Sequence, residues 1–211
     1  MTYRDIARLI STRLRRRRLR GFKKLFPPDR CQRVLDLGGS PEAWEMMQYP
    51  GEITLMNLDP AMMTGQDRYI RVIGDARNLA YADRSFDLVF SNSVIEHVGG
   101  PQDALAFARE MQRVGKAFYC QTPNKWFPIE PHFGTLFLHW FPGILSNYYV
   151  FRYGTLYGWM NKPDRELVKL LARDVRLLTR KELLRLFPNA EIRCERLLLW
   201  PKSYIAMRTP Q

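Results

Sequence analysis

The chain has 211 residues, 46% of them hydrophobic and 26% charged, which is typical of one folded α/β domain with or without a tail. This composition excludes a globally disordered chain and a polytopic membrane protein. The formal net charge is +12, of which residues 1–25, with ten Lys or Arg and one acid, supply +9. The basic character therefore belongs to an N-terminal leader, whereas a nucleic-acid-binding domain more often carries its charge on the folded surface.

We expect residues 1–28 to form a basic N-terminal helix and residues 29–211 a single domain. Arginines interrupt the apolar residues of the leader, so it is not a signal peptide. Its apolar residues fall near helical spacing, and they are Tyr3, Ile6, Ala7, Ile10 and Leu14. One interpretation is a solvated helix packed on the domain. The other is a basic amphipathic segment that contacts anionic lipid or RNA phosphate.

The three cysteines, Cys31, Cys120 and Cys194, are widely spaced, without a CxxC motif or a Cys/His cluster. This spacing argues against a zinc module and a disulfide scaffold, and it fits a reducing compartment. We therefore expect three buried core thiols, no metal site and a cytoplasmic protein. A peripheral position at a membrane is the alternative location, because of the leader.

Short apolar runs along the chain predict five strands, separated by mixed segments. The expected strands are residues 33–37, 53–58, 69–73, 86–91 and 116–122. Between the last two, apolar residues recur at helical spacing over residues 101–114. Strands that alternate with helices predict a mostly parallel sheet covered by helices on both faces. Such sheets bind ligands at the carboxyl ends of their strands.

The ends of the first four expected strands carry the residues that a nucleoside site needs. The first strand runs into Gly38-Gly39, where the missing Cβ lets a ligand approach the backbone closely. Asp59 after the second strand is placed to accept hydrogen bonds from ribose hydroxyls, and Asp75 after the third from an adenine amine. The fourth strand ends in Ser91-Asn92. Any one Asp could simply cap a turn, but four such ends in register predict a nucleoside site.

These motifs resemble those of the class I S-adenosylmethionine-dependent methyltransferases. VLDLGG at residues 34–39, NLDP at 57–60 and GDARNL at 74–79 are similar to their first three motifs, and SFDLVFSNSVIEHV at 85–98 is similar to their small-molecule branch. The resemblance covers residues 33–122. It continues in residues 177–192, like the last helix and strand of such enzymes, and in residues 203–208, like their final antiparallel strand.

The resemblance implies a Rossmann-like sheet of seven mostly parallel strands and S-adenosylmethionine as the cofactor. One departure is that Ser40 or Pro41 stands where the family often has a third glycine. The residues that the resemblance assigns to the cofactor are Asp36, Gly38, Gly39, Ser40, Asp59, Pro60, Asp75, Ala76, Ser91 and Asn92. Asp36 would order the first loop, and Ser91 and Asn92 would lie beneath the cofactor.

Three residues are candidates for catalysis at the acceptor. His97 follows the fourth strand in a Glu-His pair, as a general base or as a structural residue at a helix start. Glu130 and His132 belong to a proline-rich loop, TPNKWFPIEPH, after the fifth strand. They either face the acceptor or satisfy backbone groups of the loop.

The segment of residues 118–160 is rich in aromatic side chains, and we expect it to be an insertion or lid after the fifth strand. Residues 118–159 hold 14 of the chain's 27 aromatic residues. Pro142, Gly143, Ser146 and Asn147 argue against a membrane span. The aromatic side chains would exclude water and line an apolar pocket, or they would form an interfacial patch that acts with the leader.

These features together favour an S-adenosylmethionine-dependent methyltransferase acting on a small or lipid-linked molecule, with peripheral contact to anionic membrane through residues 1–25. Nucleic acid is the second candidate partner, which would make the protein an RNA methyltransferase that uses its leader. However, neither the Asp/Asn-Pro-Pro-aromatic phrase of amine methylation nor a Pro-Cys nucleophile is present. A dehydrogenase is disfavoured because G-x-G-x-x-G is missing. A non-catalytic scaffold of the same fold remains as another class.

Overall fold

The computed structural model describes residues 15–63, 68–130, 132–141 and 143–210. The described residues form two compact units. Unit 1 lies within residues 1–90, 111–118 and 209–211, and unit 2 within residues 91–110 and 119–208. We describe each unit by itself.

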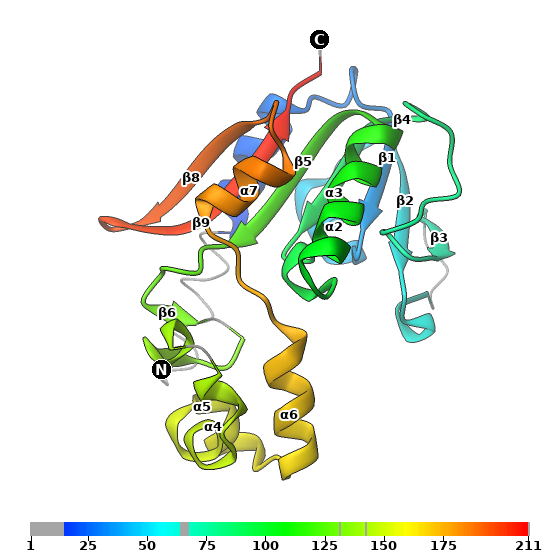
Figure 1. The fold of residues 1–211 in the computed structure, drawn as a ribbon. Helices are drawn as coiled ribbons and strands as arrows, with labels where there is room; N and C mark the ends of the chain where they lie inside the picture. The colour runs from blue at the N-terminus through cyan, green and yellow to red at the C-terminus, as the bar shows by residue number, and fades with distance from the viewer. Residues whose placement is uncertain (1–14, 64–67, 131, 142, 211) are drawn as a thin grey trace. The chain divides into compact units, whose positions relative to one another are not determined.

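Unit 1 is built on parallel strands (Figure 1). Strand β1 (Arg33–Leu37) pairs with β2 (Glu52–Asn57) and with β4 (Phe86–Asn92), and β2 pairs with β3 (Ile70–Ile73). β1 and β2 are buried over four consecutive residues each, as expected for strands covered on both faces. β3 is half-exposed because it is the edge strand. Helix α2 (Pro41–Met47) follows β1, and a 3-10 turn, η1 (Pro60–Met63), follows β2.

A helix over residues 15–25 packs on this unit through aromatic side chains. Phe22 is buried and lies against Trp44 of α2, with ring centroids 6.1 Å apart, and against Phe90 of β4, at 5.0 Å. Leu19 is also buried. The second half of the expected leader is therefore a helix packed on the domain. The apolar stripe from Tyr3 to Leu14 lies outside the described residues.

Unit 2 contains the region from the second half of β5 to the end of β9 at Arg208. Helix α3 (Pro101–Val114) and strand β5 (Gly115–Pro123) each begin in one unit and end in the other. Helix α7 (Arg180–Leu186) starts with a capping box between Thr179 and Glu182, as the sequence predicts. Strands β8 (Glu191–Leu197) and β9 (Trp200–Arg208) pair antiparallel.

The seven strands follow the order β3-β2-β1-β4-β5-β9-β8. This order confirms the predicted Rossmann-like sheet with an antiparallel end. The order reverses beside β1, so the carboxyl ends of β1 and β4 mark the switch point at which such sheets bind ligands.

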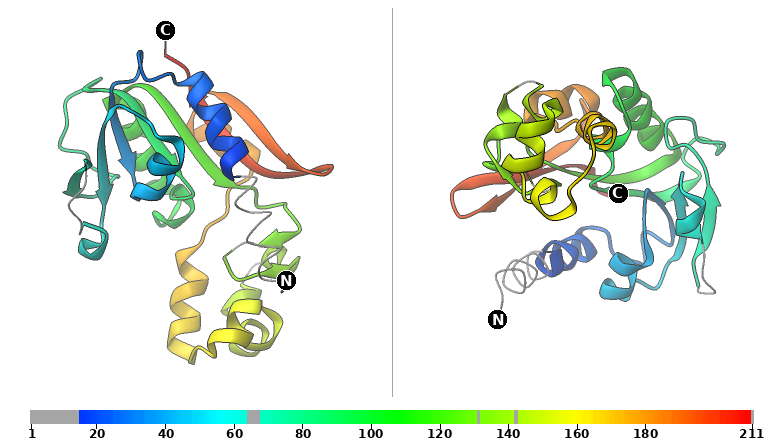
Figure 2. Two further views of the ribbon diagram at one scale, coloured as in Figure 1. Left: turned by 180° about the vertical axis from the view of Figure 1, so that it is seen from behind. Right: turned by 90° about the horizontal axis from the view of Figure 1, so that it is seen from below.

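The region between β5 and α7 is an insertion with a small core of its own. It contains a two-stranded antiparallel sheet, two 3-10 turns and three helices: β6 (Ile129–Glu130), β7 (Thr135–Leu136), η3 (Leu138–Trp140), η4 (Ile144–Ser146), α4 (Tyr148–Gly154), α5 (Leu156–Asn161) and α6 (Arg165–Asp174). In both views of Figure 2, α6 lies beside α4 and α5. Phe133, Phe151 and Val168 are buried together there.

The insertion differs in extent from the aromatic segment expected over residues 118–160. Residues up to Pro123 belong to β5. At the other end, Val168 of α6 completes the small core, so the insertion continues to Asp174. Aromatic content did not predict that α6 belongs to the insertion, because α6 is a polar helix that contributes only one of its faces to the small core.

The expectation of three core thiols is wrong for Cys194. Cys31 and Cys120 are buried, but Cys194 is exposed. It lies on β8, which is an edge strand of the sheet, where alternate side chains face water. Among the described residues, no helix is both long enough and apolar enough to cross a membrane.

Candidate functional site

The loop after β1 is shaped by Asp36 and the two glycines that follow it. Asp36 is 1% exposed, and its Oδ2 accepts a hydrogen bond of 2.7 Å from Trp44 Nε1. Gly38 has a φ of 72°, a conformation that L side chains rarely adopt. A Cβ added to Gly39 would lie 1.9 Å from Asp36 Oδ2. Both glycines are therefore required by geometry, and Ser40 serves as the N-cap residue of α2.

Asp36 keeps one buried polar atom without a partner. No hydrogen bond reaches its Oδ1 from the described residues. Burial raises the pKa of the carboxyl to about 8, although the Trp44 hydrogen bond acts in the opposite direction. A buried acceptor beside a turn with no Cβ is the arrangement expected of a loop that binds a polar ligand through its backbone.

The two other carboxylates proposed for the nucleoside follow β2 and β3 of unit 1. Asp59 is exposed, and its Oδ1 accepts a hydrogen bond of 2.9 Å from Ala61 N, one residue beyond Pro60. Asp75, which precedes Ala76, binds Arg77 in its own loop, with Oδ2 2.7 Å from Nη2. Hydrogen bonds from Arg77, with its charge, lower the pKa of Asp75. Asp75 is therefore already partnered, whereas Asp59 stands at the surface.

The end of β4 belongs to unit 2 and leads into a strained turn. Ser91 is fully buried, and its Oγ has no partner among the described residues. Asn92 is half-buried. Ser93 has a φ of 58°, and its N–H donates to Gln121 O at 2.9 Å. Left-handed backbone at a non-glycine residue is concentrated at functional sites.

Immediately after this turn, the structure brings the three predicted catalytic residues together. His97, at the end of η2 (Ile95–His97), has its Nε2 3.2 Å from Nε2 of His132. Glu130, at the end of β6, has its Oε1 2.5 Å from Nδ1 of His132. On the other side, His97 Nδ1 lies 3.1 Å from Oδ2 of Asp174, the last residue of α6. We call these four residues and Glu96 the histidine cluster.

Glu96 is the most deeply buried member of the histidine cluster. It is 0% exposed, and its Oε2 accepts a hydrogen bond of 2.9 Å from Thr122 Oγ1. Its Oε1 has no hydrogen bond from the described residues and lies 4.0 Å from His132 Nε2. Burial raises the pKa of this carboxyl. The cluster therefore contains a buried oxygen that faces an imidazole at more than hydrogen-bond distance.

The electrostatic environment shifts the pKa values of His132 and Glu130 in opposite directions. Burial opposes protonation of His132, but the hydrogen bond and charge of Glu130, with the other nearby carboxylates, outweigh it and raise the pKa of the imidazole. Burial alone would raise the pKa of Glu130, but hydrogen bonds from His132 and two backbone amides hold it below its usual range. His132 is thus fixed in orientation by a buried carboxylate.

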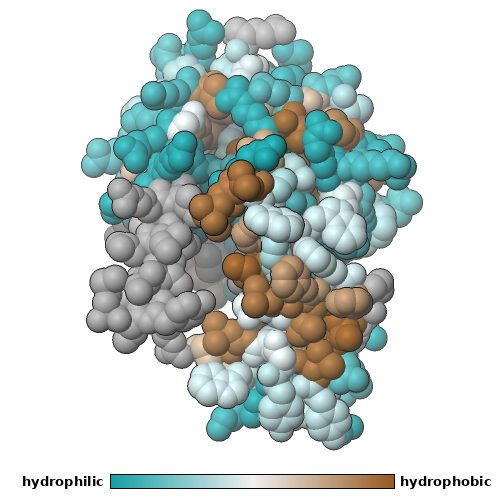
Figure 3. All heavy atoms as spheres, turned by 90° about the vertical axis from the view of Figure 1, so that its left-hand side faces the viewer, coloured by the Kyte–Doolittle hydropathy of each residue, from teal (hydrophilic) through white to brown (hydrophobic). Residues whose placement is uncertain are grey.

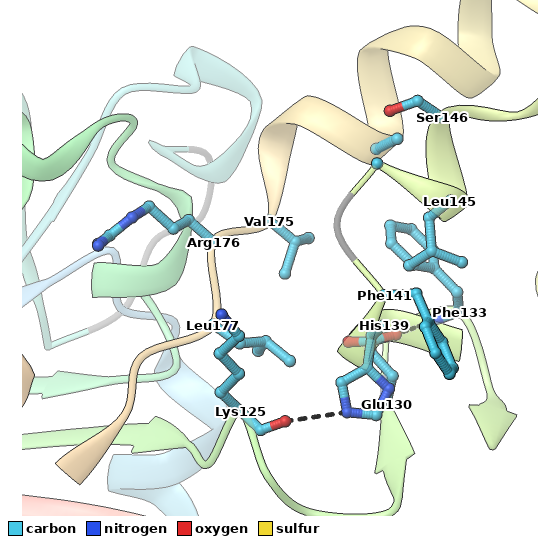
Figure 4. A pocket seen from close by; sticks show the side chains of 12 residues that line it. Lys125, Glu130, Phe133, His139, Phe141, Leu145, Ser146, Val175, Arg176 and Leu177 are labelled. Atoms are coloured by element: carbon cyan, nitrogen blue, oxygen red, sulfur yellow. Dashed lines mark hydrogen bonds between the residues drawn. The ribbon is translucent and has the colours of Figure 1, made fainter. Parts of the chain in front are cut away.

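The insertion encloses a pocket of about 210 Å³ that shares Glu130 with the histidine cluster (Figure 4). His139 lies in it, with Nε2 3.0 Å from the carbonyl oxygen of Lys125. The apolar part of its lining comes from the first half of the insertion and from the segment that follows α6: Phe133, Phe141, Leu145, Val175 and Leu177. The lining also includes Lys125, Glu130, His139, Ser146 and Arg176, so the pocket is of mixed polarity, and the expected role of the aromatic segment as a lid stays a prediction.

The sequence did not predict the role of two members of the histidine cluster, Asp174 and Glu96. Asp174 lies 77 residues from His97 in sequence, and nothing in its own segment distinguishes it from another acid at a helix end. Glu96 was recognised as part of the Glu-His phrase, but its burial and its unpartnered oxygen follow only from the fold. Whether the residues assigned from the sequence bind a cofactor or an acceptor stays a prediction.

Comparison with known proteins finds a family model described as a methyltransferase domain, which matches residues 33–117. Among curated proteins, an uncharacterized protein of Mycobacterium tuberculosis is 36% identical over 52 residues, 25% of this chain and 18% of that protein. The chain thus spans less than a fifth of the curated relatives that it matches.

Two solved structures show the same fold at low identity. An S-adenosylmethionine dependent methyltransferase from Mesorhizobium loti matches with a TM-score of 0.55 and 15% identity, over 89% of this chain and 94% of that one. The N-terminal domain of EvdMO1, solved with S-adenosylhomocysteine and D-fucose, matches with a TM-score of 0.55 and 18% identity, over 93% and 83%.

Proposed function

We propose that this chain is a class I methyltransferase that uses S-adenosylmethionine and methylates a small or lipid-like acceptor at the histidine cluster. The methyltransferase-domain model over residues 33–117 supports this proposal. The observation that carries this proposal is the pocket of the insertion, which shares Glu130 with His132. A volume of about 210 Å³ is below the roughly 300–1,000 Å³ of pockets for drug-sized ligands. It suits a small molecule or one apolar end of a longer one.

The residues of unit 1 fit the cofactor. Gly38 has a left-handed backbone, Gly39 packs directly against the Asp36 carboxylate, and Asp36 offers a buried oxygen without a partner among the described residues. When bound, the cofactor supplies an already activated sulfonium methyl group, so transfer is an in-line displacement. The protein's own part is then to orient the acceptor and to receive its proton. His132, held by Glu130, is the base that we propose for this step.

Peripheral contact with an anionic membrane is part of the same proposal. Arg16, Arg20 and Lys23 line a groove of unit 1 beside apolar Leu19 and Met47. In Figure 3 the lower part of the molecule, which the insertion forms, carries apolar residues beside aromatic ones. The large exposed side chains of the insertion include Trp126, Leu136, Phe137, Phe141, Tyr149, Tyr153, Leu156 and Trp159. Basic side chains and exposed aromatic side chains are each typical of proteins that bind a membrane surface.

Calorimetric titration of the purified protein with S-adenosylmethionine, with NADH as the control ligand, tests the cofactor. We expect saturable binding of S-adenosylmethionine alone. A screen for methyl transfer over lipid extracts, small phenols and RNA then tests the acceptor. Turnover on RNA alone would replace the acceptor proposed here, and cofactor binding without turnover on any of them would favour the scaffold.

Asp59→Ala provides the first prediction about a single residue. If Asp59 holds the ribose hydroxyls, its removal should weaken binding of S-adenosylmethionine by about 1.5–3 kcal/mol, as for hydrogen bonds to a charged group. Glu52→Ala is the matched control, because Glu52 is an exposed acid at the opposite end of the same strand. Equal affinities of Asp59→Ala and the unaltered protein in titration calorimetry would contradict the assignment.

A further inference from the structure

We propose that the histidine cluster binds one divalent first-row transition-metal ion, with zinc as the best-suited member, through His97 Nε2, His132 Nε2 and Glu96 Oε1. These three donor atoms all lie within 4.8 Å of one another. Nothing in the sequence pointed to a metal, because His132 follows the Glu-His pair only after 35 residues and no ligand spacing of a known metal module is present.

The first argument is the orientation of the two imidazoles. Each has its Nδ1 on a carboxylate oxygen, at 3.1 Å from Asp174 for His97 and at 2.5 Å from Glu130 for His132. An ionised carboxylate only accepts hydrogen bonds, so each Nδ1 carries the hydrogen. In the neutral imidazoles the two Nε2 lone pairs then face each other across 3.2 Å. Two facing lone pairs at this distance need a cation between them, which is either one shared proton or a metal ion.

The second argument is the match to the geometry of bound metal ions. Zinc binds imidazole nitrogen at about 2.0–2.1 Å in a tetrahedral arrangement, which puts two such nitrogens roughly 3.3 Å apart. The observed separation is 3.2 Å. Carboxylate–histidine–metal triads fix the orientation of the ligand ring in metal sites, and here both histidines have such a carboxylate behind them.

The third argument is Glu96. Its Oε2 is held by Thr122, while its buried Oε1 has no hydrogen bond from the described residues and lies 4.0 Å from His132 Nε2. A buried carboxylate oxygen without a partner is costly unless something cationic reaches it. A shift of this oxygen by about 1 Å would complete a set of two imidazoles and one carboxylate, with bond lengths near 2.1 Å.

This donor set selects the kind of ion and leaves a place for a ligand. Imidazole favours zinc, iron, cobalt and nickel over magnesium and calcium, which prefer oxygen ligands. Three protein ligands leave the fourth position of zinc open, as in catalytic sites. An acceptor oxygen bound there would lose its proton more readily, so His132 would act as a ligand in place of a base. That role rests on the proposed function, but metal binding itself does not.

Titration calorimetry with zinc chloride, on chelator-treated full-length protein, tests the proposal. We expect one zinc ion per chain and at least a tenfold loss of affinity in His97→Asn and in His132→Asn, each checked for folding by circular dichroism. His139→Asn is the control, because His139 binds backbone carbonyls of Lys125 and Phe127. Binding of cobalt to the unaltered protein should give visible absorption that both ligand variants lose.

Two results would overturn the metal site. One is the absence of zinc binding by well-folded protein, which would leave a proton between the two Nε2 atoms. The other is zinc binding of equal strength in the His97, His132 and His139 variants, which would place the ion on the surface. Titration of the same samples with S-adenosylmethionine separates this failure from failure of the proposed function, because cofactor binding requires none of these histidines.

Discussion

At the scale of single residues, the buried carboxyl of Asp36 makes the stability of the protein depend on pH. Burial raises the pKa of its carboxyl to about 8, well above the ordinary value near 4. Between these two values the folded protein binds a proton that the unfolded chain does not. The stability that this proton confers is complete below pH 4 and is lost as the pH rises through about 8.

Asp36→Asn should remove this dependence, because an amide of the same shape has no proton to lose. We expect the free energy of unfolding of the unaltered protein to fall, relative to the variant, between pH 4 and pH 8. This change in the free energy of unfolding, relative to the variant, should exceed about 1.4 kcal/mol, which corresponds to a pKa shift of one unit. Urea denaturation at several pH values measures it, and parallel curves for the two proteins would contradict the raised pKa.

Gly39 is the second residue whose role the geometry defines. An alanine Cβ would overlap Asp36 Oδ2 at 1.9 Å, so Gly39→Ala should lower the free energy of unfolding by about 1–3 kcal/mol, as overpacking does. Gly21→Ala is the control, because Gly21 lies in the helix of residues 15–25 and an alanine Cβ there would meet no atom within 4 Å. That change should stabilise by about 0.5–1 kcal/mol. Equal effects in thermal denaturation would refute the argument.

At the scale of elements, the capping box fixes where α7 begins. Thr179 Oγ1 accepts a hydrogen bond of 3.2 Å from Glu182 N, and Thr179 N donates one of 2.9 Å to Glu182 Oε2. Thr179→Ala should therefore cost about 0.5–2 kcal/mol of stability. Thr179→Ser keeps the hydroxyl and should cost little. Chemical denaturation of the three proteins checks this, and an equal loss in both variants would point to the missing methyl group instead.

The elements also show what the sequence can predict. β1 and α3 begin and end at the predicted residues, because continuous burial and helical spacing leave clear patterns. β6 and β7, with two residues each, are too short to leave one. The helices α4 and α5 were expected only as an aromatic lid. Their apolar residues serve both the small core and the exposed surface, so no single face stands out.

In the candidate site, too, some residues could be predicted from sequence motifs and others could not. Motifs predicted Asp36, Gly38 and His97 because Asp36 lies near the end of β1, Gly38 directly follows β1, and His97 comes soon after β4. The loop with Glu130 and His132 was identified from its residue types, but their meeting with His97 depends on the fold of the insertion. Asp174 was beyond prediction, because a single acid at the end of α6 joins the cluster only through tertiary structure.

At the scale of the whole molecule, the proposed membrane contact predicts a measurable role for the basic groove of unit 1. Each Lys or Arg near an anionic surface contributes about 1 kcal/mol. Replacing Arg16, Arg20 and Lys23 by Gln should therefore weaken binding to vesicles with phosphatidylserine by on the order of a hundredfold. Neutralising Lys169, Arg173 and Arg193 is the control. Sedimentation with vesicles measures the binding. An equal loss of binding in both variants would indicate that the net charge of the protein, and not this groove, determines membrane binding.

The small core of the insertion has a consequence for how an acceptor reaches the pocket. Only Phe133, Phe151 and Val168 are buried in it among the described residues, and Phe133 also lines the pocket. Because cooperative units with few buried apolar contacts open at a low free energy, the insertion should unfold locally far more often than the strands of unit 1. The pocket wall is thus expected to open at a lower free energy than the sheet of unit 1, and under the proposed function this local opening would widen the way of an acceptor into the pocket.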